Sequence, residues 1–293
     1  MTAAQQMWAV PDGLPAGGFI VPQSRLQSGV ASAEPALWIT DDPVPDLGSL
    51  YARLLAAHGD TGLWPLLLTE RSSPIGITSP ALSAGLASRM RGSSPLFADG
   101  RPWHAGEIMP VPAYRIAELD ADELLARDWD READANPDRF DFGTGAFPGV
   151  EHPSWPGLAE PVTPGPDPDD VLARVVTAPG GVRQLTPNDR VYLGLVPSAD
   201  SAAALTAAGW KSNAGSAAEI AAVIRSWQQR FGVRLCAIGF DTLALSVAWP
   251  PLTAECARRV AAEHAAFCPD IDDDLAEYAR TLQGAAVWQF WWD

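Results

Sequence analysis

The sequence predicts an α+β protein whose C-terminal domain is a β-α-β-β-α-β ferredoxin-like antiparallel sandwich, preceded by a smaller α/β N-terminal region. Two long helical patterns and a hairpin between them carry this prediction, together with one strand-like segment at each end. In chain order these are the strand 191–196, the helix 216–231, the hairpin 233–249, the helix 253–267 and the strand 287–292. Both long helices are expected on one face of the sheet.

The N-terminal region alternates strand-like and helix-like segments. Residues 36–40 read ALWIT, a strand, and leucines recur at helical spacing over 47–55 before the buried strand 63–68. This is a strand, helix, strand unit. Further on, 108–114 is a weak strand interrupted by proline, and 120–129 is a short helix with its apolar residues on one side. No catalytic motif occurs in this half.

A proline-rich stretch separates the two regions. Residues 136–170 contain eight prolines with glycines and acids between them, so neither a helix nor a strand ladder can persist there. Aromatic residues such as Phe142 and Trp155 are too numerous for a free coil, which indicates that part of the stretch packs against a domain. The predicted division is therefore an N-terminal α/β region (1–135), a linker or packed arm (136–170) and a C-terminal α+β domain (171–293).

The helix 216–231 has the clearest boundaries in the chain. Ser216 and Glu219 have the spacing of a capping box, an apolar stripe ends at Phe231, and Gly232 supplies the stop. Before it, Val191–Val196 alternates as a strand and a short helix is expected over 200–208.

Turn and end signals also mark the hairpin and the elements after it. Asp241 and Thr242 form the predicted tight turn, and Pro250 and Pro251 end the second strand. The helix 253–267 directs His264 inward, and an acidic helix is expected over 272–282 before the last strand.

Composition limits the classes of function. The net charge is −16, and residues 118–170 hold fifteen acids against three bases, so a nucleic-acid backbone would be repelled. No window reaches the roughly 18 apolar residues that span a bilayer, so no membrane partner is expected. The N-terminal residues lack the pattern of a signal peptide, and three cysteines are an odd number for a disulfide framework. A cytoplasmic location with reduced thiols is expected.

Several segments of the C-terminal domain resemble a known bacterial family. RVYLGLVPS, SWQQRFGVRLCAIGFDTLALSVAWPP, AAEHAAFCPD and WQFWWD look like the domain-of-unknown-function family DUF4253, which is common in actinobacteria. The resemblance covers roughly residues 188–293. It implies no known activity. In the family the FCPD piece is often followed by Asn or Ile and a Gln-containing loop, whereas here Ile271 is followed directly by acids.

One small group of residues could carry chemistry. His264 and Cys268 lie four apart on one helix and share a face, and Asp270 follows the end of that helix. With Asp241 from the hairpin turn, these are the candidate catalytic residues. The alternative is that both residues are structural, with His264 hydrogen-bonded inside the core and Cys268 a small buried apolar residue. A cysteine at a helix C-terminus also meets the negative end of the dipole, which raises its pKa where a nucleophile needs it lowered.

A metal site and a cofactor site are not expected. Cys256, His264 and Cys268 spread over about 18 Å at helical rise, which one ion cannot bridge, and no dinucleotide or phosphate-loop fingerprint occurs. The last strand offers a different kind of candidate. Trp288, Phe290 and Trp292 share one face while Trp291 points to the other, so Trp291 and Trp292 are candidates for interaction, and an exposed Trp291 would indicate a contact surface.

Two hypotheses from different classes follow. The favoured one is a cytoplasmic, non-enzymatic binding or protein-interaction module, for example of the immunity type that masks a toxin, because the chain is acidic and poor in motifs. The alternative is a hydrolase or transferase that uses the His, Cys and Asp cluster in a cleft of the C-terminal domain. Accessibility of His264 and Cys268 discriminates between them.

Overall fold

The computed structural model describes residues 8–21, 35–69, 96–97, 114–135, 142, 146–147, 154–186, 190–210, 215–239, 241–271 and 274–292. The described strands are β1 (Gly17–Val21), β2 (Leu37–Thr40), β3 (Leu63–Thr69), β4 (Leu96–Phe97), β5 (Val191–Pro197), β6 (Val233–Ile238), β7 (Thr242–Val247) and β8 (Val287–Trp291). The described helices are α2 (Leu47–Ala56), α3 (His58–Thr61), α5 (Tyr114–Ala117), α6 (Ala121–Ala135), α7 (Pro168–Thr177), α8 (Gly181–Leu185), α9 (Ser201–Ala208), α10 (Ala217–Phe231), α11 (Ala254–Phe267) and α12 (Leu275–Leu282). The protein is therefore of the α+β class, as predicted.

All the described strands belong to one mixed sheet in the order β4-β1-β2-β5-β3-β6-β7-β8. Only the β3–β6 pair is parallel among the described strands, and the other neighbours are antiparallel. Strands from both sides of the predicted 136–170 linker thus share one sheet and one continuous core. The division into 1–135, 136–170 and 171–293 stays a prediction about folding units.

The ferredoxin-like arrangement is not confirmed. The predicted elements occur in the predicted chain order, but that topology would place β5 between β8 and β7, whereas β5 pairs with β2 and β3 instead. β3 lies between β5 and β6. All seven residues of β3, LWPLLLT, are buried, and a strand that is apolar on both faces is stable only in the middle of a covered sheet.

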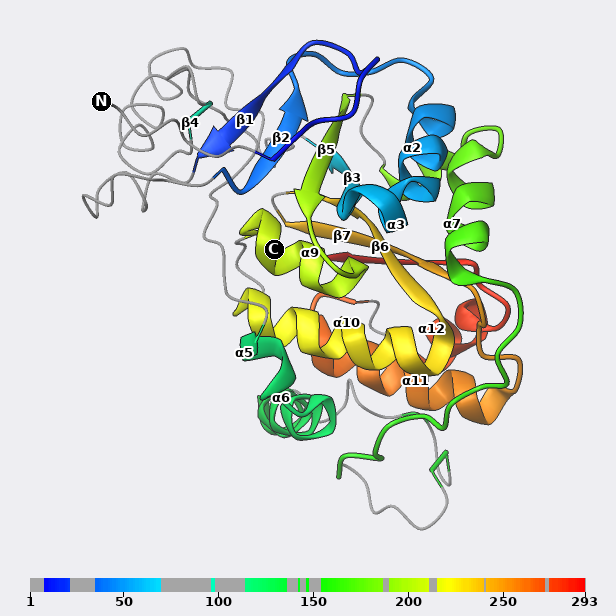
Figure 1. Ribbon diagram of the computed structural model, residues 1–293. Helices are drawn as coiled ribbons and strands as arrows, with labels where there is room; N and C mark the ends of the chain where they lie inside the picture. The colour runs from blue at the N-terminus through cyan, green and yellow to red at the C-terminus, as the bar shows by residue number, and fades with distance from the viewer. Residues whose placement is uncertain are drawn as a thin grey trace, which may run out of the picture.

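Helices cover both faces of this sheet. Figure 1 shows α2 and α7 on one side and α10 and α11 on the other. Side chains that alternate along β8 confirm the layers. Trp288 and Phe290 contact Trp227 of α10, whereas the side-chain amide of Gln289 donates to the carbonyl of Gln184 in α8. The two long helices α10 and α11 lie on the same face, as the sequence predicts.

Most local predictions agree with the structure. The helix α10 ends at Gly232, whose φ of +61° is the left-handed conformation that favours glycine at a helix C-terminus. Ser216 is the N-cap of α10, but its side chain makes no capping hydrogen bond, so the predicted capping box is wrong. Glu219 pairs instead with Arg127 of α6. Of the weak strand predicted over 108–114, residues 108–113 lie outside the described residues and Tyr114 begins α5.

The described part of the proline-rich stretch packs against the helical layer. Residues 154–167, here called the arm, contain no helix or strand, and Ala159 within them is buried. The main-chain N–H of Val162 donates to the carbonyl of Arg230, and Trp249 Nε1 donates to the carbonyl of Pro166. The arm then leads into α7, whose N-cap Asp167 accepts hydrogen bonds from two main-chain N–H groups of the first turn.

Candidate functional site

The structure brings four of the sequence-predicted residues together at one end of the sheet. The main-chain N–H of Trp292 donates to the carbonyl of Asp241, at 3.0 Å, and the thiol of Cys268 donates to the carbonyl of Trp291, also at 3.0 Å. Asp270 is exposed two residues beyond Cys268. Cys268 itself is buried at the C-cap of α11, where its N–H bonds to the carbonyl of His264. These contacts connect the end of α11 to β8 and the hairpin turn.

His264 lies inside the core with no exposed surface. Its Nδ1 is 2.9 Å from the hydroxyl of Tyr278 in α12, and its ring packs edge-on against Trp288 and Phe290, with centroids 4.6 and 4.8 Å away. Burial, with a smaller contribution from the positive charge of Arg230, holds the pKa of His264 well below 6.5. The imidazole is therefore neutral and belongs to an aromatic cluster.

The other two cysteines are also restrained. Cys236 in β6 is fully buried, its thiol donates to the carbonyl of Ala244 at 3.2 Å, and burial raises its pKa. Cys256 on α11 is half-buried, and burial followed by the charge of Glu263 raises its pKa as well. The thiols of Cys236 and Cys256 therefore stay protonated near neutral pH. Among the described residues, no group of three or more His, Cys, Asp or Glu side chains could hold a metal ion.

A buried ion pair, which the sequence analysis missed, lies next to His264. Arg230 of α10 and Glu263 of α11 form two hydrogen bonds, Nη1 to Oε1 at 2.8 Å and Nη2 to Oε2 at 2.6 Å. Trp227 Nε1 donates to the same carboxylate at 2.7 Å, and so does the main-chain N–H of Ala159, also at 2.7 Å. The guanidinium in turn donates to the carbonyl of Ala159 at 3.0 Å. The pair therefore fixes the arm to both helices.

A weak signal of this pair exists in the sequence. Glu263 is the only charged residue in the apolar run AAEHAAF, in a position where an unpaired carboxylate would be costly to bury. Its partner is 33 residues away in the chain, and no spacing rule connects the two.

A small pocket lies beside the cluster of predicted residues, between α6, α10 and the end of α11. Its volume is about 120 Å³. Phe267, Pro269 and Trp292 form one wall, so the two segments FCPD and WQFWWD, on which the family resemblance rests, meet here. The remaining lining residues come from α6, α10 and α11; they are Leu124, Leu125, Asp128, Arg131, Glu219, Ile220, Val223 and Ala266. All the apolar members of the lining are buried except Pro269, which is partly exposed.

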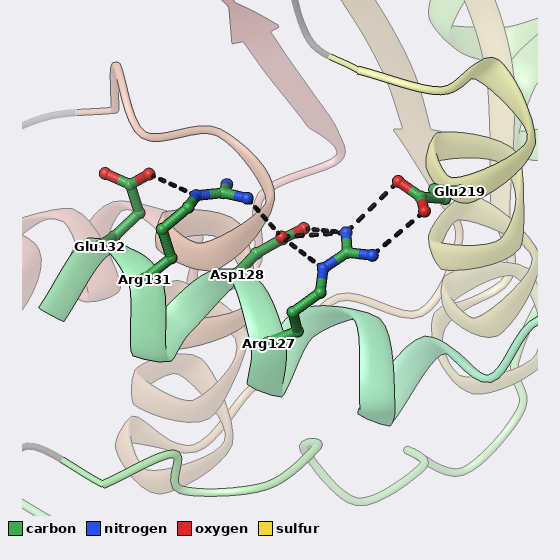
Figure 2. Close-up of polar contacts among 5 residues, drawn as sticks. All are labelled: Arg127, Asp128, Arg131, Glu132 and Glu219. Atoms are coloured by element: carbon green, nitrogen blue, oxygen red, sulfur yellow. Dashed lines mark hydrogen bonds and ion pairs between the residues drawn. The ribbon is translucent and has the colours of Figure 1, made fainter. Parts of the chain in front are cut away.

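Charged side chains form the rim of the pocket. Figure 2 shows Arg127 between the carboxylates of Asp128 on its own helix and Glu219 on α10. Hydrogen bonds to these carboxylates, first to Asp128 and then to Glu219, raise the pKa of Arg127. Arg131, with 61% of its side chain exposed, pairs with Asp128 at 3.0 Å and with Glu132 at 3.3 Å. Of these five residues, Asp128, Arg131 and Glu219 line the pocket itself, so two carboxylates and one guanidinium give its rim a net negative charge.

Fold and site together define an α+β protein with a covered mixed sheet and a pocket of side-chain size at one corner. Residues 192–293 match the family model described as Domain of unknown function (DUF4253), which confirms the resemblance of the C-terminal region. Comparison with curated proteins and with solved structures gave no match. None of the described helices has the length and apolar character needed to cross a bilayer.

Proposed function

We propose that this protein is a non-enzymatic protein-binding module that holds one apolar side chain of its partner in the pocket between α6, α10 and α11. The observation that carries the proposal is the construction of the pocket, an apolar floor with a charged rim. Partner-binding surfaces commonly combine a buried anchor pocket with a polar rim, because most of the affinity comes from a few well-packed side chains.

The size of the pocket limits what it can hold. A cavity of roughly 150 Å³ accepts a benzene ring. At about 120 Å³ the pocket suits one branched or aromatic side chain, and it is too small for a nucleotide or a typical cofactor. Phe267 and Trp292 offer aromatic surface to such a side chain.

The charge around the pocket favours a basic partner. α6 carries six acidic residues and two arginines, and it forms one side of the pocket. The acidic stretch 118–170, of which α6 is a part, holds most of the net charge of −16. A basic residue next to the apolar anchor would therefore be attracted, and association would be accelerated. A basic toxin masked by an immunity-type protein would fit this description.

The alternative, a hydrolase or transferase built on the predicted cluster, has less support. His264 has no exposed surface and bonds to Tyr278, and the buried thiol of Cys268 donates its proton to a carbonyl. A nucleophile and its base must reach the substrate, so this pair would require the end of α11 to open.

The test is site-specific photocrosslinking in the native host. A benzophenone amino acid replaces Arg131 at the rim, and a control chain carries it at Leu252, which is 77% exposed and does not line the pocket. The Arg131 probe is expected to capture one basic protein that the Leu252 probe does not capture. Val223→Phe fills the pocket and should abolish capture, whereas the same change in α8, Val182→Phe, should preserve it.

Three outcomes would overturn the proposal. They are equal capture from Leu252 and Arg131, repeated absence of any captured protein, and undiminished capture by a folded Val223→Phe chain. If Val223→Phe does not fold, Glu219→Lys takes its place, because a cation at the rim should weaken the attraction for a basic partner without entering the core.

A further inference from the structure

β8 is the terminal strand of the sheet, and its outer edge carries hydrogen-bonding groups that β7 does not use. The carbonyl of Ala286 accepts from Val247 N, and Trp292 N donates to the carbonyl of Asp241. Main-chain groups of successive residues in an antiparallel strand point alternately to the two sides. The N–H and C=O groups of Val287, Gln289 and Trp291 therefore point away from β7.

These outward groups are largely unpaired within the described ranges. No neighbouring described residue bonds to the main-chain N–H or C=O of Val287 or Gln289 on the outer edge. The carbonyl of Trp291 accepts the thiol of Cys268, and a carbonyl oxygen can accept a second hydrogen bond. Trp291 is 48% exposed and belongs to this row.

β8 also lacks the features that keep free edges apart. Natural edge strands are commonly protected by charged side chains, by proline or by a bulge. β8 reads VWQFW, with no charge and no proline, and its pairing with β7 has no register shift. The edge is thus suited to accept another strand.

The outward groups are symmetric about Gln289, which is what pairing with an identical strand requires. If two β8 strands meet antiparallel with Gln289 opposite its own copy, Val287 of one chain faces Trp291 of the other. Each of these pairs then uses outward groups on both strands. The side chains of Val287, Gln289 and Trp291 share one face, so each exposed indole would pack on a valine of the second copy.

We infer that the partner of this edge is a second copy of the chain, added antiparallel through β8 about a two-fold axis at Gln289. A two-fold dimer of this kind is isologous and joins the two sheets into one. The charge of −16 on each chain opposes the association, so the dimer should become tighter as salt screens the repulsion. A dimer held by ion pairs would respond to salt in the opposite direction. The inference does not depend on the pocket, which is lined from the other side of the sheet.

The experiment is sedimentation of the full chain from about 1 to about 100 µM, a range in which small interfaces associate. The expected result is a rise from 31.1 kDa toward twice that mass, at lower concentration when salt is added. Gln289→Pro removes the central outward N–H at a position where an edge strand tolerates proline. It should leave the chain monomeric and folded, while Gln289→Ala, which keeps that N–H, should still dimerise.

A crosslink tests the register directly. The two copies of residue 289 would have Cα atoms about 5.5 Å apart, within the range of a disulfide, whereas the Cα atoms of the two copies of residue 291 would be roughly 14 Å apart. Gln289→Cys should therefore give a disulfide dimer under mild oxidation that Trp291→Cys and the unaltered chain do not give.

A monomer at every concentration and salt would overturn the inference, and so would a dimer that survives Gln289→Pro. If the proline variant does not fold, Trp291→Lys decides, because a dimer that persists with a cation at this edge is not formed through β8. Loss of the dimer in Val223→Phe would place the interface at the pocket and would also refute the inference. If the photocrosslinking experiment finds no partner at the pocket, the expected results for the β8 dimer do not change.

Discussion

Replacing Glu263 with alanine removes the carboxylate that joins the arm, α10 and α11. Four hydrogen bonds of 2.6 to 2.8 Å end on this carboxylate, two from Arg230 and one each from Trp227 and the N–H of Ala159. The guanidinium of Arg230 is almost fully buried and would lose its counter-charge. We therefore expect Glu263→Ala to lower the free energy of unfolding by about 3 to 5 kcal/mol, the usual cost of leaving one member of a buried pair alone.

The cost should be visible in thermal and chemical denaturation. For a chain of this size, roughly 2 to 4 °C of thermal midpoint corresponds to each kcal/mol, so a loss on the order of 10 °C is expected by circular dichroism. Urea unfolding followed by tryptophan fluorescence gives the free energy itself. Glu263→Gln is the matched control for charge, because it keeps the shape but turns an amide N–H₂ toward donor groups.

A double substitution tests the reasoning more sharply. The double variant Arg230→Met with Glu263→Leu removes both charges and keeps most of the volume. Its loss of unfolding free energy should therefore be at least about 2 kcal/mol smaller than the summed losses of the two single variants. A loss of less than about 1 kcal/mol in Glu263→Ala, or single losses that simply add in the double variant, would show that the pair is not coupled in this way.

Two further predictions concern His264 and the thiols. The pKa of His264 is held below its ordinary value of 6.5 in the folded chain, so the unfolded chain takes up the proton first. The contribution of His264 to the free energy of unfolding should therefore be fully present above pH 6.5 and should be lost as the pH falls below it. Thermal midpoints between about pH 5 and 8 should show the native chain losing up to about 1.4 kcal/mol per pH unit more than His264→Gln loses. The same dependence on pH in both chains would count against a buried neutral imidazole. Alkylation read by mass spectrometry should modify half-buried Cys256 first and faster as pH rises, while Cys236 and Cys268 react only on unfolding. Rapid reaction of Cys268 near neutral pH would contradict its burial and strengthen the enzyme hypothesis.

Local sequence signals were sufficient for the elements of the C-terminal region. The apolar stripe and Gly232 define α10, the turn residues and the prolines after the second strand define the hairpin, and His264 was placed inward from its position on the stripe of α11. Each of these features depends on neighbours a few residues apart, where helical and strand periodicity act.

The candidate site was predicted only in part. The sequence selected Asp241, Cys268 and Trp292, and these do meet at one end of the sheet. It did not indicate the pocket, because the floor combines α6 with helices about a hundred residues later in the chain. The residues of α6 that form the rim look like an ordinary solvated acidic helix when considered alone.

The sequence by itself determined the class of protein, the family of its C-terminal region and the order of helices and strands along the chain. Only the tertiary structure decided that β3 enters the sheet between β5 and β6, and that Arg230 finds Glu263. Strand order and buried ion pairs depend on contacts between distant segments. Their free energy comes from burial and desolvation in the complete core, which no local pattern encodes.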